Sequence, residues 1–374
     1  MKKINTNLCY ILLLLIIGSI IANKDAVVDS IISTFMDKSA KELFKTYHLL
    51  FEKSKEYEIN SEEGIKRYVI FKENVKKIKT HNARKLTWTE GINQFTDLTS
   101  DEFKQRFLMS ENEIEQEIKH FKKFSLDDYD ETQDEKIKDD PDRNNASNNV
   151  GALPNIDHRQ YLKAVRNQGS CGSCYAFACA AATEANFSKY MGLAPFYLST
   201  QQIVDCSTST SKCNGGSASG GFSYIQNKGG LVEESVYPYK GSYSGSCLPI
   251  NVLSNKYKIS GYKSYVATSY STIDGWHELL TDGPMYIRTD GYSLQNYRGG
   301  IITFSLLTTK KCNTTNHAVT ATGFGYDKIG AYILARNSWG TKWGESGYFR
   351  AYYEKLEKDT CYLTRYGYRP IPSA

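Results

Sequence analysis

The placement of the cysteines constrains this chain more than any other feature. Its 374 residues include nine cysteines, but none lies between Cys9 and Cys171, whereas eight lie from Cys171 to Cys361. This distribution predicts a leader that folds without disulfides, followed by a body that disulfides can cross-link in an oxidising compartment. Spacing alone leaves the pairing of the eight open.

The first residues have the pattern of a signal peptide. Lys2 and Lys3 precede a largely apolar stretch from Leu8 to Ala22, which ends on a small residue. The alternative, a retained membrane anchor, is disfavoured because this stretch is short for a bilayer span. We therefore expect residues 1–22 to be removed, with no stable membrane anchor, and the protein to reach a lysosome, a food vacuole or the outside of the cell. Three sequons are candidates for glycosylation, at Asn145, Asn186 and Asn313.

The leader is predicted to be helical. Within Glu63–Asn82, apolar residues recur at helical spacing: Ile65, Val69, Phe71, Val75 and Ile78. Ser100 is a suitable cap for a short helix that starts at Asp101. Residues 125–150 are rich in Asp, Glu and Asn and predict an exposed linker, the kind of segment that proteases cut.

The body is predicted to be α+β, with a helical first half and a strand-rich second half. A helix is expected from Cys174 to Tyr190. The expected strands are rich in β-branched and aromatic residues: Tyr257–Tyr265, Met285–Thr289, Ala318–Phe324, Ala331–Arg336 and Tyr348–Tyr353. This division favours two lobes with a cleft where they meet.

Three residues of the body suggest nucleophilic chemistry. Cys174 follows a glycine-rich turn at a predicted helix N-terminus, where the helix dipole favours a thiolate. His317 opens a predicted strand, and Asn337 follows another. Together they supply a nucleophile, a base and a group that orients the base. By residue type alone, a disulfide cysteine, a structural histidine and a turn asparagine are the more common explanations.

The local sequences distinguish these alternatives. Gln168-Gly-Ser-Cys-Gly-Ser-Cys174 resembles the active-site motif of papain-like cysteine proteases. Further stretches follow in the order of that family: Leu198–Cys206, Cys213-Asn-Gly-Gly, Val236-Tyr-Pro-Tyr, Asn316-His-Ala-Val and Asn337-Ser-Trp-Gly. In the leader, the ERFNIN pattern of cathepsin L/H-like propeptides is matched by Glu63, Arg67, Phe71, Asn74, Ile78 and Asn82, and the motif after it by Gly91, Asn93, Phe95 and Asp97.

The resemblance implies a papain-like two-lobe fold, with a helical left lobe and a β-barrel-like right lobe, behind an inhibitory propeptide. The implied domains are residues 1–22, 23–150 and 151–374, with maturation between Asn148 and Leu153. The resemblance makes Cys174 the nucleophile, His317 its base, Asn337 the orienting amide and Gln168 an oxyanion donor. It also implies disulfides Cys171–Cys213, Cys206–Cys247 and Cys312–Cys361, which leaves Cys179 as a buried thiol. Trp339 is expected to cover the bond between His317 and Asn337.

The same resemblance outlines a substrate site. Gly215 and Gly216 would pair with the substrate backbone, and the specificity pocket would be lined by Ser217, Ala218, Arg288, Ala318 and Tyr366. Arg288 is unusual there. Either its side chain points to solvent, or the pocket tolerates an acidic side chain two residues before the cleaved bond.

Several positions depart from the family pattern, and two other functions stay open. Tyr175 stands where the family usually has Trp, His158 also replaces a Trp, and Asn316 replaces an Asp before the histidine. The alternatives to an endopeptidase are an exopeptidase of the same fold and a non-catalytic binding protein.

The expected partners are polypeptide substrates, the propeptide itself and cystatin-like inhibitors. We expect a monomer that uses no cofactor or metal. The net charge of only +5 and the lack of a basic run with aromatics argue against nucleic acid. The acidic linker suggests a pH trigger for maturation, because carboxylates lose their charge at low pH.

Overall fold

A computed structural model of the chain describes residues 39–110, 113, 153–249, 257–266, 273–304, 312, 314–353 and 361–373. These residues belong to two compact units. The first holds residues 39–85 and 90–99, and the second holds residues 86–89 and those from 100 onward. The predicted signal peptide, the acidic linker, the maturation site and the sequons at Asn145 and Asn313 lie outside the described residues.

The first unit consists of helix α3 (Ala40–Leu50), a 3-10 turn (Lys53–Lys55) and the long helix α4 (Glu62–Ala83). Ser39 and Ser61 cap the two helices through their hydroxyls. On α4, Phe71, Val75 and Ile78 are buried, as helical spacing predicts. Ile65 and Val69 are more than half exposed, so the predicted apolar face was wrong for these two. On a helical wheel of 3.6 residues per turn, they point roughly 110–155° away from the buried stripe.

The motif residues of α4 bind the chain that follows the helix. Asn74 Nδ2 donates to the carbonyls of Thr96 and Leu98, both at 2.9 Å. Arg67 pairs with Glu63 at 2.6 Å and donates to the Asp97 carbonyl at 3.0 Å. Residues 90–99 are irregular, and these side chains supply the hydrogen-bond partners that their backbone carbonyls would otherwise lack. They therefore fix this segment within the first unit.

The buried Asp97 organises the other side of the first unit. Its carboxylate accepts hydrogen bonds from Tyr47 at 2.7 Å and Tyr57 at 2.8 Å, and Lys53 Nζ lies 3.2 Å from it. Burial, followed by the charge of Asp97, raises the pKa of both phenols. A fully buried carboxylate is tolerated here because each of these three partners donates a hydrogen bond or carries a positive charge.

The helical part of the second unit contains α5 (Ser100–Phe107), α8 (Cys174–Met191), α9 (Thr200–Cys206) and α10 (Ala218–Asn227), with 3-10 turns at Arg159–Tyr161 and Lys212–Asn214. Residues 174–188 of α8 are all buried. A helix buried on all sides needs small residues, and α8 supplies six alanines between Ala176 and Ala185. It packs on one side against α9 and α10 and on the other against strands β6 and β9.

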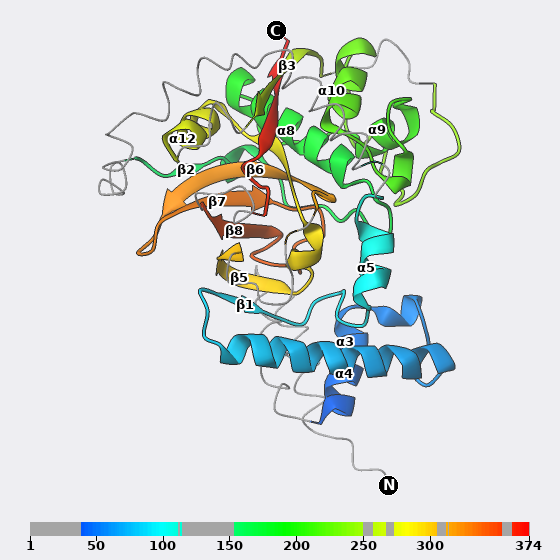
Figure 1. Ribbon diagram of the computed structural model, residues 1–374. Coiled ribbons are helices and arrows are strands. Elements are labelled where there is room, and N and C mark those ends of the chain that lie inside the picture. The colour runs from blue at the N-terminus through cyan, green and yellow to red at the C-terminus, as the bar shows by residue number, and fades with distance from the viewer. Residues whose placement is uncertain are drawn as a thin grey trace. The chain divides into compact units, whose positions relative to one another are not determined.

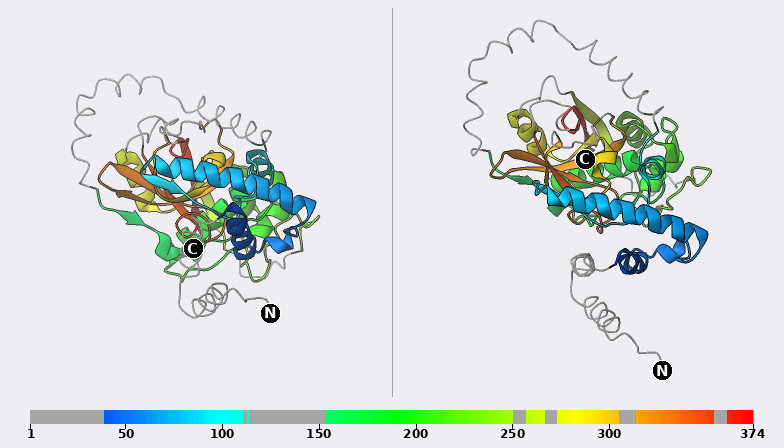
Figure 2. Two further views of the ribbon diagram at one scale, coloured as in Figure 1. Left: turned by 90° about the horizontal axis from the view of Figure 1, so that it is seen from below. Right: turned by 60° about the horizontal axis from the view of Figure 1, so that its bottom comes forward.

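The described residues also form a nine-stranded sheet, ordered β1-β5-β8-β7-β6-β4-β9-β3, with β2 on β6. Its strands are β1 (Trp88–Glu90), β2 (Ile156–Asp157), β3 (Ile259–Val266), β4 (Met285–Thr289), β5 (Tyr297–Ile302), β6 (His317–Tyr326), β7 (Ala331–Arg336), β8 (Tyr348–Tyr352) and β9 (Tyr366–Pro372). In Figure 1, α8, α9 and α10 lie on one side of β6, β7 and β8, and Figure 2 shows the same separation from two further directions.

The predicted α+β class and two-part body are confirmed, with one correction. The sheet path is open between its end strands, β1 and β3, so among the described residues it does not close into the expected barrel. Helix α12 (Ile273–Asp282) and the 3-10 turn at Gly291–Leu294 interrupt the strand-rich half, and the sequence analysis missed both. Trp276, Leu279 and Leu280 of α12 are buried at helical spacing.

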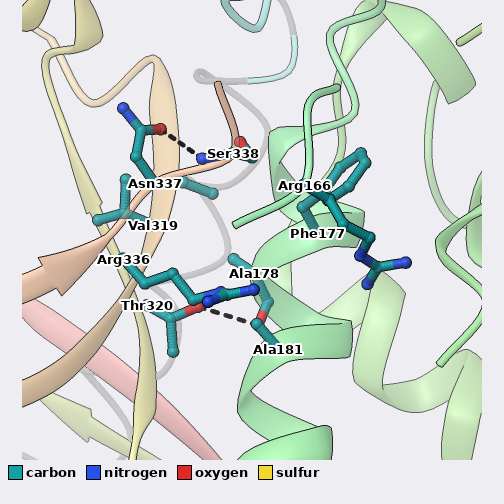
Figure 3. A pocket seen from close by; sticks show the side chains of 10 residues that line it. Arg166, Phe177, Ala178, Ala181, Val319, Thr320, Arg336, Asn337 and Ser338 are labelled. Carbon is teal, nitrogen blue, oxygen red and sulfur yellow. Dashed lines mark hydrogen bonds between the residues drawn. The ribbon is translucent and has the colours of Figure 1, made fainter. Parts of the chain in front are cut away.

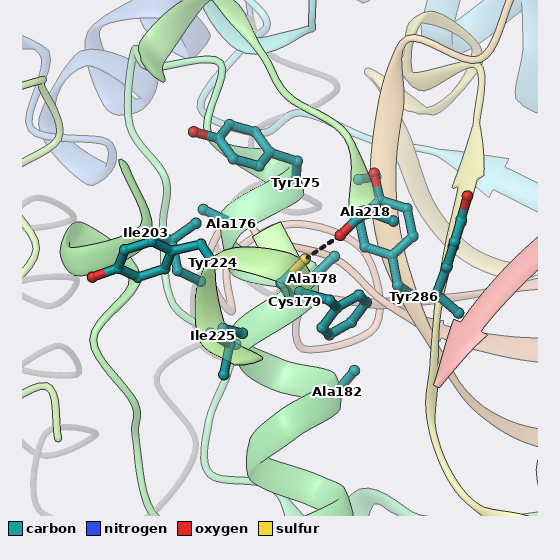
Figure 4. Packing of buried hydrophobic residues seen from close by; sticks show 14 of the residues in the cluster. Tyr175, Ala176, Ala178, Cys179, Ala182, Ile203, Ala218, Tyr224, Ile225 and Tyr286 are labelled. Carbon is teal, nitrogen blue, oxygen red and sulfur yellow. Dashed lines mark hydrogen bonds between the residues drawn. The ribbon is translucent and has the colours of Figure 1, made fainter. Parts of the chain in front are cut away.

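Within the described ranges the cysteines form three disulfides: Cys171–Cys213, Cys206–Cys247 and Cys312–Cys361. These are the pairs that the family resemblance implies. Cys179 is a free, buried cysteine whose sulfur faces the Ala218 carbonyl at 3.9 Å, in the core beneath α10 (Figure 4). Asn186 is wholly buried and its amide donates to the Ala182 and Pro284 carbonyls, so a glycan cannot occupy this sequon in the folded protein. No helix in the described ranges has the length and hydropathy to cross a membrane.

Candidate active site

Cys174 is the first residue of α8, and its position depends on the loop before it. The Cys171–Cys213 disulfide and a 2.7 Å bond from the Gly172 N–H to the Cys213 carbonyl hold that loop. A side chain at Gly172 would place a Cβ only 2.5 Å from the Cys213 oxygen, so the close approach requires glycine. The Cys174 sulfur accepts a hydrogen bond from the Ala318 N–H at 3.5 Å, which brings it to strand β6 at the residue after His317.

His317 is the first residue of β6, and Asn337 directly follows β7, its antiparallel neighbour. Nε2 of His317 lies 2.7 Å from Oδ1 of Asn337. Because this amide oxygen can only accept, Nε2 carries a proton and Nδ1 is the acceptor in the neutral ring. Nδ1 is buried and has no hydrogen-bond partner among the described residues. Trp339, which was predicted to cover the bond between His317 and Asn337, stacks on the imidazole with ring centroids 4.5 Å apart.

Burial keeps this thiol and imidazole neutral in the precursor. Burial raises the pKa of Cys174 to about 12, although the N–H groups of Ala318 and of the helix start lower it. Burial likewise lowers the pKa of His317 to about 4, opposed by the bond to Asn337 and reinforced by the charge of Arg288. An ion pair between the two side chains therefore needs a change in their surroundings.

Gln168 lies in the loop that precedes Cys174, and both ends of its amide are engaged. Its Nε2 donates to the carbonyl of Phe107 and to that of Cys171, both at 2.9 Å. Its Oε1 accepts from the hydroxyl of Ser338 at 2.6 Å. The hydroxyl of Tyr239 donates to the Gln168 carbonyl at 2.7 Å and lies 2.6 Å from Ser173 Oγ. Sequence reasoning missed Ser338 and Tyr239, although both stand inside quoted motifs.

The segment 103–110, which follows the start of α5, covers these residues within the second unit. Phe103 packs edge-on against Trp339 with ring centroids 5.3 Å apart. The Met109 N–H donates to the Asn316 carbonyl at 2.9 Å, and the Ser110 N–H donates to that of Asn214 at 3.0 Å. This covering segment therefore pairs with both sides of the site through its backbone.

Met109 packs against several of the residues predicted to line the specificity pocket. It belongs to one buried cluster with Ala218, Ala318 and Tyr366, and its sulfur lies 3.5 Å from Nη2 of Arg288. Arg288 is 1% exposed, so the alternative in which it points to solvent was wrong. Strand pairing explains this burial, because Arg288 stands opposite Ala318 in the interior of the sheet.

Ser217 and the two glycines that were predicted to pair with the substrate backbone lie between the Lys212–Asn214 turn and α10. Ser217 caps α10 by accepting from the Gly220 N–H. A Cβ on Gly215 would lie 3.1 Å from side-chain atoms of Met109 and of Glu113. Gly216 lies against the ring of Tyr175, which is buried and donates its hydroxyl to Thr210 at 3.1 Å. The ring of Tyr175 therefore packs against the backbone of Gly216 and helps to hold it in place.

A small cavity lies behind the site, between α8 and the sheet. Figure 3 shows Phe177, Ala178 and Ala181 on the helix side, and Thr320, Arg336 and Asn337 on the strand side. The two arginines that line it already bind other protein groups. Arg166 pairs with Glu184 and Glu234, both at 2.8 Å. Arg336 donates to the Lys163 and Ala164 carbonyls and to the Tyr348 hydroxyl. The cavity therefore belongs to the framework that supports Asn337.

Comparison with known proteins identifies the family. Residues 153–371 match the model of the papain family of cysteine proteases, and residues 44–103 match the cathepsin propeptide inhibitor domain. The chain belongs to the papain family. It is a cysteine protease precursor whose own propeptide domain is an intramolecular inhibitor, so the predicted family and propeptide type are confirmed.

Relatives and solved structures agree with this assignment. Fruit bromelain of Ananas comosus is 34% identical over 298 residues, which cover 78% of this chain and 75% of bromelain. Pro-cathepsin H of Bos taurus is 31% identical over 325 residues, 84% of this chain and 86% of its own. The structure of a recombinant stem bromelain precursor superposes with a TM-score of 0.70 at 27% identity, and covers 90% of this chain and 99% of its own.

Proposed function

We propose that the matured protein is a cysteine endopeptidase in which Cys174 attacks the carbonyl carbon of a peptide bond. His317 holds the thiolate as an ion pair, then gives its proton to the departing amine, which leaves a thioester on Cys174. Water, activated by the neutral imidazole, hydrolyses the thioester and restores the thiol. The observation that carries this proposal is the 2.7 Å bond from His317 to Asn337, which orients the imidazole on the strand that also contacts the cysteine sulfur.

Gln168 is suited to stabilise the oxyanion that forms during attack. Its Nε2 already binds a peptide carbonyl in the precursor, that of Phe107 at 2.9 Å. When the covering segment leaves, the same donor is available for the oxygen of a substrate. One such donor contributes about 3 kcal/mol to lowering a barrier of this kind.

Latency follows from the covering segment. While residues 103–110 lie over the site, burial keeps the Cys174 thiol protonated and the His317 imidazole unprotonated. Removal of the segment admits water, and hydration favours the charged forms of both groups. Maturation between Asn148 and Leu153 would release it. The three disulfides support passage through an oxidising secretory compartment.

The test is acid maturation of the purified precursor, with Cys174→Ala as the matched control. We expect N-terminal sequencing to find a start between Asn148 and Leu153, and the matured protein to cleave internally quenched peptides blocked at both ends. The control should cleave none and should not react with an epoxide directed at thiols.

Two results would overturn the proposal. Cleavage restricted to peptides with a free terminus would favour an exopeptidase. Epoxide labelling of Cys174 without turnover of any peptide would favour a binding protein.

A further inference from the structure

One tyrosine hydroxyl joins two residues of the loop that precedes the proposed nucleophile. Tyr239 donates to the Gln168 carbonyl at 2.7 Å, and its hydroxyl oxygen lies 2.6 Å from that of Ser173. A carbonyl can only accept, so the single hydroxyl proton of Tyr239 is used at Gln168, and Ser173 is the donor in the second bond. The Ser173 hydroxyl is therefore directed at Tyr239, and its contact with the Cys171 carbonyl is longer, at 3.4 Å.

The side chain and the backbone of Tyr239 are themselves held in place. Its ring packs edge-on against Phe177 of α8 with ring centroids 4.8 Å apart, and its N–H donates to the Glu234 carboxylate at 2.7 Å. Arg166 pairs with the same carboxylate at 2.8 Å and lies over the Phe177 ring at 5.2 Å. The Tyr239 hydroxyl is thus a fixed point to which Ser173 binds.

Ser173 differs from the serines that precede four other α-helices of the described chain. Each of those hydroxyls accepts a hydrogen bond from the N–H three residues later, and so caps its helix: Ser39 at α3, Ser61 at α4, Ser199 at α9 and Ser217 at α10. Their ψ angles are 107–168°. Ser173 has the same position before α8, but its ψ angle is 15° and its hydroxyl makes no bond to the helix.

The uncapped start of α8 leaves backbone N–H groups for the Cys174 sulfur. Burial raises the pKa of Cys174, and the N–H groups of Ala318, of Tyr175 and of Cys174 itself act against burial. A serine that capped α8 in the ordinary way would accept from the N–H of Tyr175 or Ala176. It would then compete with the sulfur for the N–H groups of this first turn.

We propose that Tyr239 is a positioning residue for the nucleophile: by binding the hydroxyl of Ser173 it keeps this serine from capping α8, so that the first N–H groups of the helix remain available to the Cys174 sulfur. This inference rests on the proposed function and adds a residue to its machinery. The second bond of the same hydroxyl, to Gln168, holds the proposed oxyanion donor beside this turn. Tyr239 therefore acts on the reacting atoms through Ser173 and Gln168.

Other titratable side chains around Cys174 are the same in wild type and in the variants that test this role. They are Cys179 and Tyr175 on α8, Tyr286 on β4 and, as the proposed partner, His317 on β6. Burial raises the pKa of Cys179 and of both phenols, so all three stay neutral at acid and neutral pH. Burial lowers the pKa of His317, and the nearby charge of Arg288 on β4 reinforces this. Burial also raises the pKa of Tyr239 to about 12, so it keeps its proton in the assay.

The test compares the matured wild type with Tyr239→Phe and with Tyr239→Phe combined with Ser173→Ala. The rate at which a thiol-directed epoxide labels Cys174 is measured from about pH 3 to 9, where imidazole and thiol titrate. We expect the acid limb of this profile, where the thiolate forms, to move up by about one pH unit in Tyr239→Phe, because the thiolate loses a hydrogen bond. In peptide hydrolysis, kcat should fall about tenfold with little change in KM.

The second substitution separates the serine from any direct effect of the hydroxyl on the sulfur. With Ser173→Ala added, no hydroxyl is left to cap α8, and the acid limb should return to its wild-type position. Tyr243→Phe is the matched control, because it removes a hydroxyl that binds the Gly245 carbonyl at 2.8 Å from an exposed ring. It should change neither readout. Epoxide titration of Cys174 normalises all proteins to active sites.

An acid limb that stays in place in Tyr239→Phe, or that moves and is not restored by Ser173→Ala, overturns the inference. A smaller fraction of active sites with an unchanged limb and kcat also overturns it, because Tyr239 would then only stabilise the fold. Labelling needs no turnover, so if wild type cleaves no peptide, the proposed function fails while the profile still tests the role of Tyr239. Should Tyr239→Phe not fold, Ser173→Ala alone decides. An acid limb at the wild-type position supports the inference, and an upward shift would show that the serine hydroxyl itself stabilises the thiolate, which overturns it.

Discussion

Ser338 and Gln168 hold each other through two hydrogen bonds. The Ser338 hydroxyl donates to Oε1 of Gln168 at 2.6 Å, and the Gln168 N–H donates to the Ser338 carbonyl at 2.8 Å. Because Oε1 is engaged by a donor, the amide of Gln168 cannot flip, and Nε2 stays directed at the Phe107 carbonyl. Ser338, which directly follows Asn337 in the chain, thus fixes the orientation of Gln168, the proposed oxyanion donor.

Ser338→Ala should therefore lower kcat of the matured enzyme by about five- to tenfold, as expected for one lost hydrogen bond, with little change in KM. Gln168→Ala should cost roughly a hundredfold or more. The double variant should be no slower than Gln168→Ala, because Ser338 acts through the glutamine. Additive losses in steady-state kinetics would show that the serine has an independent role.

The amide of Asn316 is expected to stabilise the folded protein, and a carboxylate at this position is expected to destabilise it. Its Nδ2 donates to Oδ1 of Asp290 at 3.1 Å, and its Oδ1 accepts from the Gly291 N–H at 2.8 Å. Asn316→Asp would place two carboxylates in contact, which raises the pKa of one of them. A carboxyl whose pKa is raised on folding destabilises the folded protein as pH rises from the unfolded pKa, about 3.9, through the raised folded pKa.

We expect Asn316→Asp, in a Cys174→Ala background, to unfold more easily than its parent by about 1–3 kcal/mol at neutral pH. Urea titrations at several pH values should show this gap narrowing toward pH 3. Asn316→Ala removes the same bonds without adding charge, so its deficit should not depend on pH. Equal pH profiles for the two variants would contradict the explanation.

Local pattern predicted the elements but not the pocket. Met285–Thr289 and Ala331–Arg336 were predicted with the bounds that the structure gives, because each is a short run rich in β-branched and aliphatic residues between turns. The apolar positions of α12 were present in the sequence but were read as part of a strand-rich region. Ile65 and Val69 were wrongly placed on the buried face because periodicity alone does not show how wide that face is.

The candidate site was predicted from motifs, and its environment was not. Motif resemblance located Cys174, His317, Asn337 and Gln168, which the fold gathers from separate elements. The burial of Arg288 depends on strand pairing with β6 and on a methionine 179 residues earlier in the chain. No local window contains both partners, so composition and periodicity could not decide between solvent and pocket.

His158, which replaces a usual tryptophan, is predicted to make the body sensitive to acid. It is buried, and its Nε2 contacts the Leu280 carbonyl at 2.6 Å. Burial lowers its pKa below the ordinary 6.5, although the Leu280 bond opposes this. A histidine with a lowered folded pKa contributes stability above 6.5 that is lost as pH falls through 6.5 toward the folded value.

His158→Gln keeps a donor of similar reach without the titration. In the Cys174→Ala precursor, we expect its free energy of unfolding to fall less steeply with acidity than that of the parent below about pH 6.5. His317 has a lowered pKa as well, but it is common to both proteins and cancels in the comparison. Parallel stability curves in denaturant would show that the His158 ring does not titrate on unfolding.

Phe103 is expected to be the main anchor of the covering segment. Its side chain is fully buried between Trp339, at a ring-centroid distance of 5.3 Å, and Phe107, at 5.6 Å. Phe103→Ala should weaken the seating of the segment by about 3–5 kcal/mol, the usual cost of truncating a buried phenylalanine. Because latency requires the segment to be seated, the unprocessed precursor should then expose Cys174 far more often. An epoxide should label the variant precursor at least about tenfold faster than wild type at neutral pH, since each 1.4 kcal/mol is a factor of ten.

Leu49→Ala truncates an apolar side chain that is 61% exposed, so it should leave the labelling rate unchanged. Equal labelling of wild type and Phe103→Ala would mean that backbone bonds at Met109 and Ser110 suffice to keep the site closed.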